Sequence, residues 1–106
     1  MSKPPFRDEY LEAAIEDLIE TQGSYDALRF GLGSEFSRAV TDRMDVLLEF
    51  PETGSIFSGR DVRHVAVGRF PYQIIYRFSG ETALVIAVVH ERRHPRVWLS
   101  RLDSLG

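Results

Sequence analysis

Residues 62–101 read VRHVAVGRFPYQIIYRFSGETALVIAVVHERRHPRVWLSR. Gly68 and Gly80 divide most of this stretch into runs that are rich in β-branched and aromatic residues. The runs cover residues 62–67, 70–78 and 83–90. Runs of this kind, separated by short glycine-containing turns, are typical of consecutive antiparallel strands. The stretch therefore predicts a three-stranded meander, and residues 92–106 after it form a tail with several arginines.

The period of two along a strand also assigns faces within the meander. It places Tyr72, Ile74, Tyr76 and Phe78 on one face of the second strand, which favours a place in the core for both tyrosines. The third strand is apolar on both faces, as expected for a strand with neighbours on both sides.

The first half of the chain has a helical pattern. Residues 11–22 predict a helix that Gly23 either ends or distorts, and residues 31–33 predict a loop. Ser34 is the predicted N-cap of a second helix, which Pro51 ends. The apolar stripes of these two helices are Leu11, Ile15, Leu18 and Ile19 in the first, and Phe36, Val40, Met44, Leu47 and Leu48 in the second. Before them, residues 1–5 predict a flexible leader and residues 6–10 a short edge strand.

Charge is distributed unevenly along the chain. Residues 60–101 carry eight arginines and three acidic residues, whereas residues 1–59 carry five basic and twelve acidic residues. A net charge of −3 therefore conceals a basic sheet beside an acidic helical half. Such asymmetry indicates a partner surface of opposite charge.

Length and composition exclude several classes of protein. A chain of 106 residues with 43% hydrophobic residues predicts one folded domain over residues 1–106. No apolar run approaches the ~20 residues of a membrane span, and the start has no apolar signal segment. The absence of cysteine excludes disulfides and thiolate metal sites. We expect a cytoplasmic protein without membrane contact, metal or cofactor, since its three histidines lack the spacing and acidic neighbours of a zinc site.

Short motifs recur in a fixed order along residues 10–101. They are Ala14-x-x-Asp17-Leu18 with Tyr25, Leu32-Gly33-x-x-Phe36, Phe50-Pro51-Glu52-x-Gly54, Val62-Arg63, Arg69-Phe70-Pro71-Tyr72, Ile75-Tyr76-Arg77 and Val88-x-His90-x-x-Arg93-x-Pro95-x-x-Trp98-x-x-Arg101. In this order and spacing, the chain resembles the RelE/ParE superfamily of type II toxin–antitoxin toxins. The resemblance implies an α+β fold of the order (β)ααβββ, with two helices packed on an antiparallel sheet.

The resemblance also implies a toxin that inhibits growth and is neutralised by a cognate antitoxin protein. The chain is nearer to ParE-like members, which bind and inhibit DNA gyrase. Two alternatives stay open, a RelE-like ribosome-dependent mRNA endonuclease and a non-toxic interaction module of a toxin–antitoxin complex. Operator DNA is expected to be contacted only through the antitoxin.

The candidate site residues follow from these alternatives. RNA cleavage without a metal needs a base, an acid and cations that stabilise the phosphorane. The candidates for these roles are Arg63, Arg77, His90 and Arg93. Gln73 stands where several ribonuclease members of the superfamily place a catalytic arginine, and the lysines common in RelE proper are missing, which favours the binding function.

The residues expected to bind the target or the antitoxin are Arg63, Arg69, Arg77, Arg92, Arg93, Arg96, Trp98 and Arg101. Trp98 is expected to anchor the tail on the sheet, because an indole buries a large apolar area. The strand arginines have a second interpretation, in which they pair with acidic residues of the chain's own helices.

Overall fold

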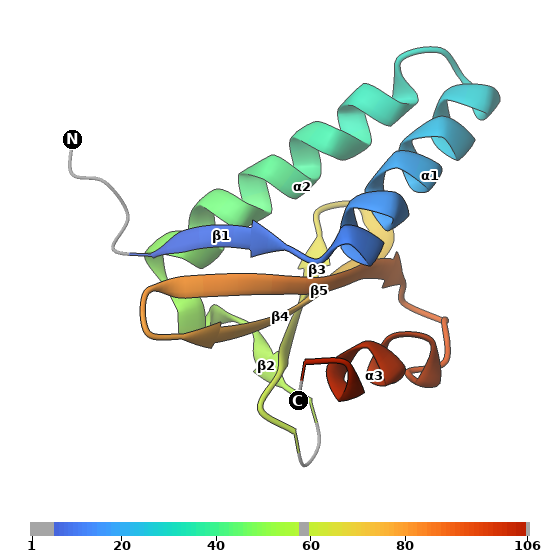
Figure 1. Ribbon diagram of the computed structural model, residues 1–106. Coiled ribbons are helices and arrows are strands. Elements are labelled where there is room, and N and C mark those ends of the chain that lie inside the picture. The colour runs from blue at the N-terminus through green and yellow to red at the C-terminus, as the bar shows by residue number, and fades with distance from the viewer. Residues whose placement is uncertain (1–5, 58–59, 106) are drawn as a thin grey trace.

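The computed structural model describes residues 6–57 and 60–105. The described residues form a five-stranded sheet in the order β1-β5-β4-β3-β2, with helices on both of its faces (Figure 1). In chain order the elements are β1 (Arg7–Tyr10), α1 (Glu12–Leu28), α2 (Leu32–Glu49), the 3₁₀ helix η1 (Pro51–Thr53), β2 (Ser55–Ile56), β3 (Arg63–Val67), β4 (Phe70–Ser79), β5 (Thr82–His90) and α3 (Arg96–Asp103). The predicted α+β fold is confirmed, while the predicted leader at residues 1–5 lies outside the described residues.

The sheet is mixed, because β1 runs parallel to β5 with Arg7 opposite Thr82 and Tyr10 opposite Val85. The predicted meander β3-β4-β5 is antiparallel, as is the short pairing of β2 with β3. A parallel pair needs a long connection between its strands. The helices and the meander provide that connection. β1 is therefore an edge strand that pairs with β5, the last strand in the chain.

The two long helices have boundaries that differ from the predicted ones. α1 continues through Gly23 to Leu28, since the cost of a helical glycine, about 1 kcal/mol, is outweighed by packing on both sides of it. α2 begins at Leu32, and Gly31 with a φ of 90° takes the N-cap position expected for Ser34. The backbone N–H of Gly33 donates to Asp26 Oδ1 at 2.7 Å, which draws the two helices together at their turn.

A first core lies between α1, α2 and the sheet. The predicted stripe of α2 is largely confirmed, since Phe36, Val40, Met44 and Leu47 are buried and Leu48 is partly buried against them. The predicted stripe of α1 is partly wrong. Leu11 and Leu18 pack against the core as predicted, but Ile15 and Ile19 are 45% and 64% exposed, because the helix turns Ala14, Thr21 and Tyr25 inward in their place.

A second core covers the opposite face of the sheet under α3, which lies below the sheet in Figure 1. The register of β4 with β5 shifts so that Ile75 pairs with Ala87 and Tyr76 with Val85. Ile86 is the extra residue of this bulge. Ile86 and Ala87 consequently both belong to the second core, which the strict alternation of a regular strand would not allow.

Trp98 anchors α3 on this core. It is 1% exposed, and its indole meets the Phe57 ring edge-on with centroids 4.9 Å apart. The expected anchoring role of Trp98 is confirmed, and the tail from residue 96 is a helix rather than a loose basic segment.

We predict that Trp98→Ala lowers the free energy of unfolding by about 3–5 kcal/mol, because it leaves a large cavity under α3. Urea denaturation measures the change. Leu105→Ala is the matched control, since Leu105 is 37% exposed and its loss is expected to cost much less. Equal stability of the Trp98 variant and the unmodified chain would contradict the anchoring role.

Candidate interaction site

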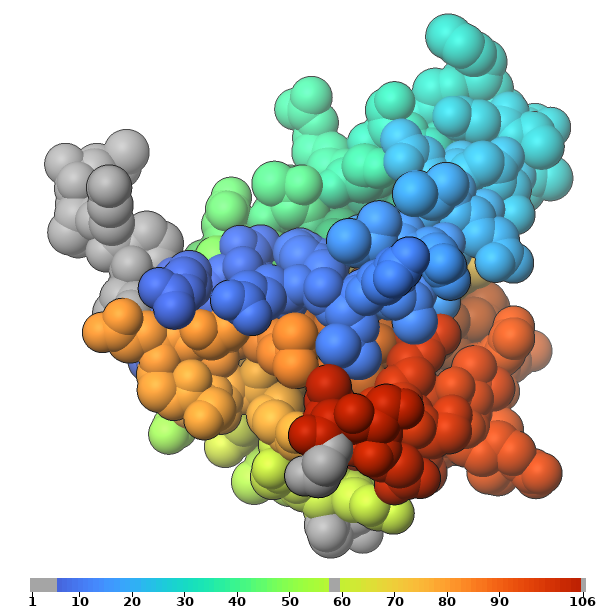
Figure 2. Space-filling model, in the orientation of Figure 1, coloured from blue at the N-terminus to red at the C-terminus, as the bar shows by residue number. Residues whose placement is uncertain are grey.

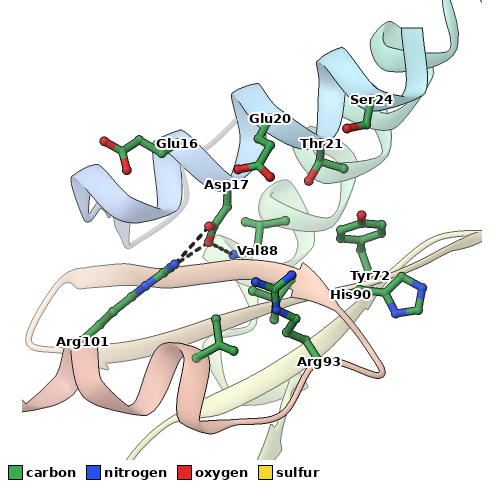
Figure 3. Close-up of a pocket in the computed structure, with 12 residues that line it drawn as sticks. Glu16, Asp17, Glu20, Thr21, Ser24, Tyr72, Val88, His90, Arg93 and Arg101 are labelled. Atoms are coloured by element: carbon green, nitrogen blue, oxygen red, sulfur yellow. Dashed lines mark hydrogen bonds and ion pairs between the residues drawn. The ribbon is translucent and has the colours of Figure 1, made fainter. Parts of the chain in front are cut away.

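A pocket of about 290 Å³ lies between α1 and α3, beside the end of β5 (Figure 3). In the space-filling view, α1 lies above and α3 below on the face of the molecule that is turned toward the reader (Figure 2). The pocket is lined by Glu16, Asp17, Glu20, Thr21, Ser24, Tyr72, Val88, Val89, His90, Arg93, Val97 and Arg101. It collects three of the predicted site residues, His90, Arg93 and Arg101.

An ion pair between Asp17 and Arg101 closes one end of this pocket. Arg101 Nη1 and Nη2 donate to the two carboxylate oxygens of Asp17 at 2.7 and 3.1 Å. Both side chains are less than one-fifth exposed. Two guanidinium nitrogens facing two carboxylate oxygens make the bidentate arrangement that fixes both groups in one orientation.

The same two side chains complete the free edge of β5. β1 pairs with β5 only as far as Val85, after which the chain turns into α1. Beyond that point the N–H of Val88 donates to Asp17 Oδ2 at 3.0 Å, and the carbonyl of Ile86 accepts from Arg101 Nη1 at 3.0 Å. Asp17 and Arg101 therefore replace the hydrogen bonds that a longer β1 would have made, and they join α1, β5 and α3.

His90 and Arg93 stand at the other end of the pocket. His90 Nδ1 accepts from the backbone N–H of Arg92 at 3.1 Å, and its ring meets Tyr72 edge-on with centroids 5.3 Å apart. Arg93 is exposed, and its guanidinium points toward α1, where Glu20 lies (Figure 3). The hydrogen bond to the following turn indicates that His90 fixes the path of the chain as it leaves β5.

The pocket as a whole is not a cationic surface. Three acidic side chains of α1 line it, Glu16, Asp17 and Glu20, against two arginines. Asp17 already neutralises one of these arginines. A phosphodiester would meet carboxylates as often as guanidinium groups, which opposes RNA binding here.

The remaining predicted arginines lie elsewhere. Arg63 and Arg77 line a separate pocket at the opposite end of the meander, with Arg77 Nη2 3.0 Å from Asp61 Oδ1. Arg63 Nη1 donates to the carbonyls of Gly54 and Glu52 at 2.8 and 3.3 Å. The nuclease candidates are thus divided into two pairs that do not share a pocket.

Arg69 pairs with Glu35 at the start of α2, as the second interpretation of the strand arginines expects. Arg29 joins the same carboxylate at 3.0 Å. Hydrogen bonds from Arg69 and Arg29 hold the pKa of Glu35 below its usual range, so the carboxylate remains charged in mildly acidic solution. Arg77 pairs with a loop residue instead of a helical one.

Arg92 is exposed in the turn between β5 and α3, and Arg96 is exposed at the first residue of α3. The turn is fixed by hydrogen bonds from the backbone N–H of Arg92 to His90 Nδ1 and from that of Arg96 to His94 Nδ1, each 3.1 Å long. Trp98 is buried beneath α3, so it contributes to this surface as its anchor.

The acidic residues of α1 were not expected in the site. Glu16 and Glu20 were not among the predicted site residues, and Asp17 was noted only within a motif. The sequence does contain one signal for this arrangement. Glu16 and Glu20 are four residues apart, and residues four apart on a helix share a face. Nothing in the sequence near Asp17 indicates which distant residue its carboxylate meets.

In the ranges 6–57 and 60–105, no helix has the length and apolar character needed to cross a membrane. The same residues contain no group of three or more histidine or acidic side chains arranged to hold a metal ion.

The fold defines the chain as a small α+β protein, and comparison with known families specifies it further. Residues 9–95 match the family model described as the ParE toxin of the type II toxin–antitoxin system parDE. The chain therefore belongs to the ParE toxin family. None of the curated proteins matches its sequence.

A solved structure described as the chromosomal ParDE toxin–antitoxin system from P. aeruginosa shares the fold. The TM-score is 0.71 at 14% sequence identity, and the match covers 83% of this chain and 98% of the other. At this identity the likeness concerns the arrangement of helices and strands.

We predict that Asp17 and Arg101 stabilise the fold largely through their interaction with each other. Asp17→Asn and Arg101→Gln should each lower the free energy of unfolding by about 1.5–3 kcal/mol, because each leaves a partly buried charge without its partner. A double-mutant cycle followed by urea denaturation measures the coupling between them.

The control cycle uses Asp61→Asn and Arg77→Gln. The Asp61 side chain is 75% exposed, so the coupling in this pair should stay below about 1 kcal/mol. A coupling between Asp17 and Arg101 no larger than that of the control would show that the pair does not hold the three elements together.

Proposed function

We propose that this ParE-family toxin inhibits growth in the cytoplasm by binding DNA gyrase, and that a cognate antitoxin neutralises it. The observation that carries the proposal is the separation of the nuclease candidates. Arg63 and Arg77 line one pocket, and His90 and Arg93 line another. A base and the cations that stabilise a phosphorane must act on one phosphate, within hydrogen-bond reach of it.

The environment of each candidate supports binding over cleavage. Arg77 is paired with Asp61, and the pocket around His90 is rich in carboxylates. Gln73 lies in the middle of β4 and cannot replace the charge of a catalytic arginine. What remains are the exposed arginines after β5, Arg92 and Arg96, whose backbone is held by histidine nitrogens, and they suit recognition of an acidic protein surface.

Neutralisation by an antitoxin fits the exposed apolar residues of the helical hairpin. Ile19 is 64% exposed, Leu28 is 78% exposed and Phe30 is 96% exposed. Leu28 ends α1 and Phe30 lies in the turn before α2, and an exposed apolar patch is typical of surfaces that a partner covers. An antitoxin segment that folds on binding would bury them, and the toxin would then contact operator DNA only through the antitoxin.

We predict that the purified toxin inhibits DNA supercoiling by gyrase and does not cut RNA. The two activities are measured side by side, in a supercoiling assay and in a ribosome-loaded translation reaction with a defined mRNA. Specific cleavage of that mRNA, abolished by His90→Ala, would overturn the proposal and favour a ribosome-dependent endonuclease. Inactivity in both assays together with tight antitoxin binding would favour a non-toxic interaction module.

The exposed arginines after β5 are the proposed target contacts. We predict that Arg92→Glu combined with Arg96→Glu weakens gyrase binding by about tenfold or more, since each lost charge-assisted bond is worth about 1.5–3 kcal/mol. Calorimetry measures the affinity, and the melting temperature should be unchanged because both side chains are exposed. Arg38→Glu on α2 is the matched control, and equal effects of the control and the double variant would exclude a specific role for the turn.

A further inference from the structure

The pocket between α1 and α3 contains charged groups that the proposed function leaves unused. Glu20 projects into it from α1 and Arg93 from the turn after β5, and the two side chains point toward each other (Figure 3). Neither forms an ion pair with a described residue, so their charged atoms lie more than 4.0 Å apart. A carboxylate and a guanidinium that face each other in this way present one negative and one positive wall to a ligand between them.

A buried hydroxyl group belongs to the negative wall. Thr21 is 8% exposed and lines the pocket, and its hydroxyl points from α1 toward it (Figure 3). The hydroxyl of Thr41 on α2 donates to the carbonyl of Ser37 at 3.0 Å, whereas the hydroxyl of Thr21 forms no hydrogen bond with any described residue. Buried polar side chains are in most cases hydrogen-bonded. A ligand that carries a hydrogen-bonding group next to Glu20 would satisfy this hydroxyl.

The rest of the lining limits the size and character of the ligand. Val88 of β5 and Val97 of α3 give the pocket an apolar part, and the ring of Tyr72 lies on the side away from Arg101 (Figure 3). Asp17 and Arg101 already neutralise each other. The volume of about 290 Å³ is near the lower limit of ~300 Å³ for small-molecule sites. The pocket therefore suits a small molecule with two opposite charges and a short aliphatic part.

We propose that this pocket binds a free α-amino acid with an aliphatic side chain. The ammonium group of the ligand donates to the carboxylate of Glu20 and to the hydroxyl oxygen of Thr21. The carboxylate of the ligand accepts from the guanidinium of Arg93, and its side chain lies against Val88 and Val97. Residues within a peptide chain do not carry an ammonium and a carboxylate on the same carbon, so this arrangement selects a free amino acid over a segment of a partner protein.

The probe is L-leucine, and two analogues each lack one of its charges. N-acetyl-L-leucine has no ammonium group, and L-leucinamide has no carboxylate. Each is titrated into the full chain, and backbone amide shifts are followed in NMR spectra. Saturable shifts centred on Glu20, Thr21 and Arg93 are expected with L-leucine. Each analogue should bind at least about tenfold more weakly, since it loses a charge-assisted hydrogen bond.

Variants of the two walls test the assignment of each group. Glu20→Gln and Arg93→Gln should each weaken the binding of L-leucine by about tenfold, and both side chains are exposed, so these variants should fold. Thr21→Val keeps the shape of the side chain and removes only the hydroxyl, and it should weaken binding by about threefold or more. Glu12→Gln on α1 and Arg38→Gln on α2 are the matched controls, because neither residue lines the pocket.

Three results would overturn the proposal. Equal binding of L-leucine and L-leucinamide would make the pocket a site for cations alone. Equal losses in the site variants and in the controls would show that binding depends on overall charge. An absence of saturable shifts at millimolar L-leucine would show that Glu20 and Arg93 are not available to a zwitterion. Gyrase inhibition is assayed separately, so failure here is distinct from failure of the proposed function.

Discussion

The ion pair between Asp17 and Arg101 is the constraint on which the arrangement of the other elements depends. It joins two residues that are 84 positions apart and belong to helices on opposite faces of the sheet. Its carboxylate and guanidinium also complete the edge of β5 where β1 has ended. An edge with unpaired backbone groups would otherwise have to be solvated or buried at a cost. One pair of side chains thus fixes the position of α1 and α3 and removes part of an open sheet edge.

The division of the molecule into two cores accounts for the distribution of its charged groups. The helices α1 and α2 pack on one face of the sheet, and the shorter α3 packs on the other. Several arginines lie in two places outside these cores. One is the turn that leads into α3, and the other is the end of the sheet farthest from that turn. Local hydrogen bonds hold each place rigidly. In the first, histidine ring nitrogens accept from the backbone N–H groups of Arg92 and Arg96, and in the second, the carbonyl of Gly54, next to η1, accepts from Arg63. Two rigid basic sites at opposite ends suit recognition of two partner segments by one small protein.

Much of the fold followed from local sequence patterns. The strand runs, the Pro51 stop and the stripe of α2 are short-range signals, and the structure confirms them. The rotation of α1 was mispredicted because Ile15 and Ile19 are apolar but exposed, so hydrophobicity alone selected the wrong face. The bulge at Ile86 and the pairing of Asp17 with Arg101 were not predictable, since both depend on residues brought together by tertiary structure. The candidate site was incomplete for the same reason, because its acidic wall belongs to a distant helix.

The position of Trp98 late in the chain has a consequence for biosynthesis. Every strand that α3 covers is translated before Trp98 and Leu102, the two buried residues of that helix. During synthesis the helical hairpin is completed before the strands of the meander and α3, and apolar surface that is still uncovered is prone to aggregation. The nascent protein consequently passes through a stage in which its helical hairpin is formed but its arginine turn is not yet anchored. A partner that recognises the hairpin could engage the chain at that stage, before translation has finished.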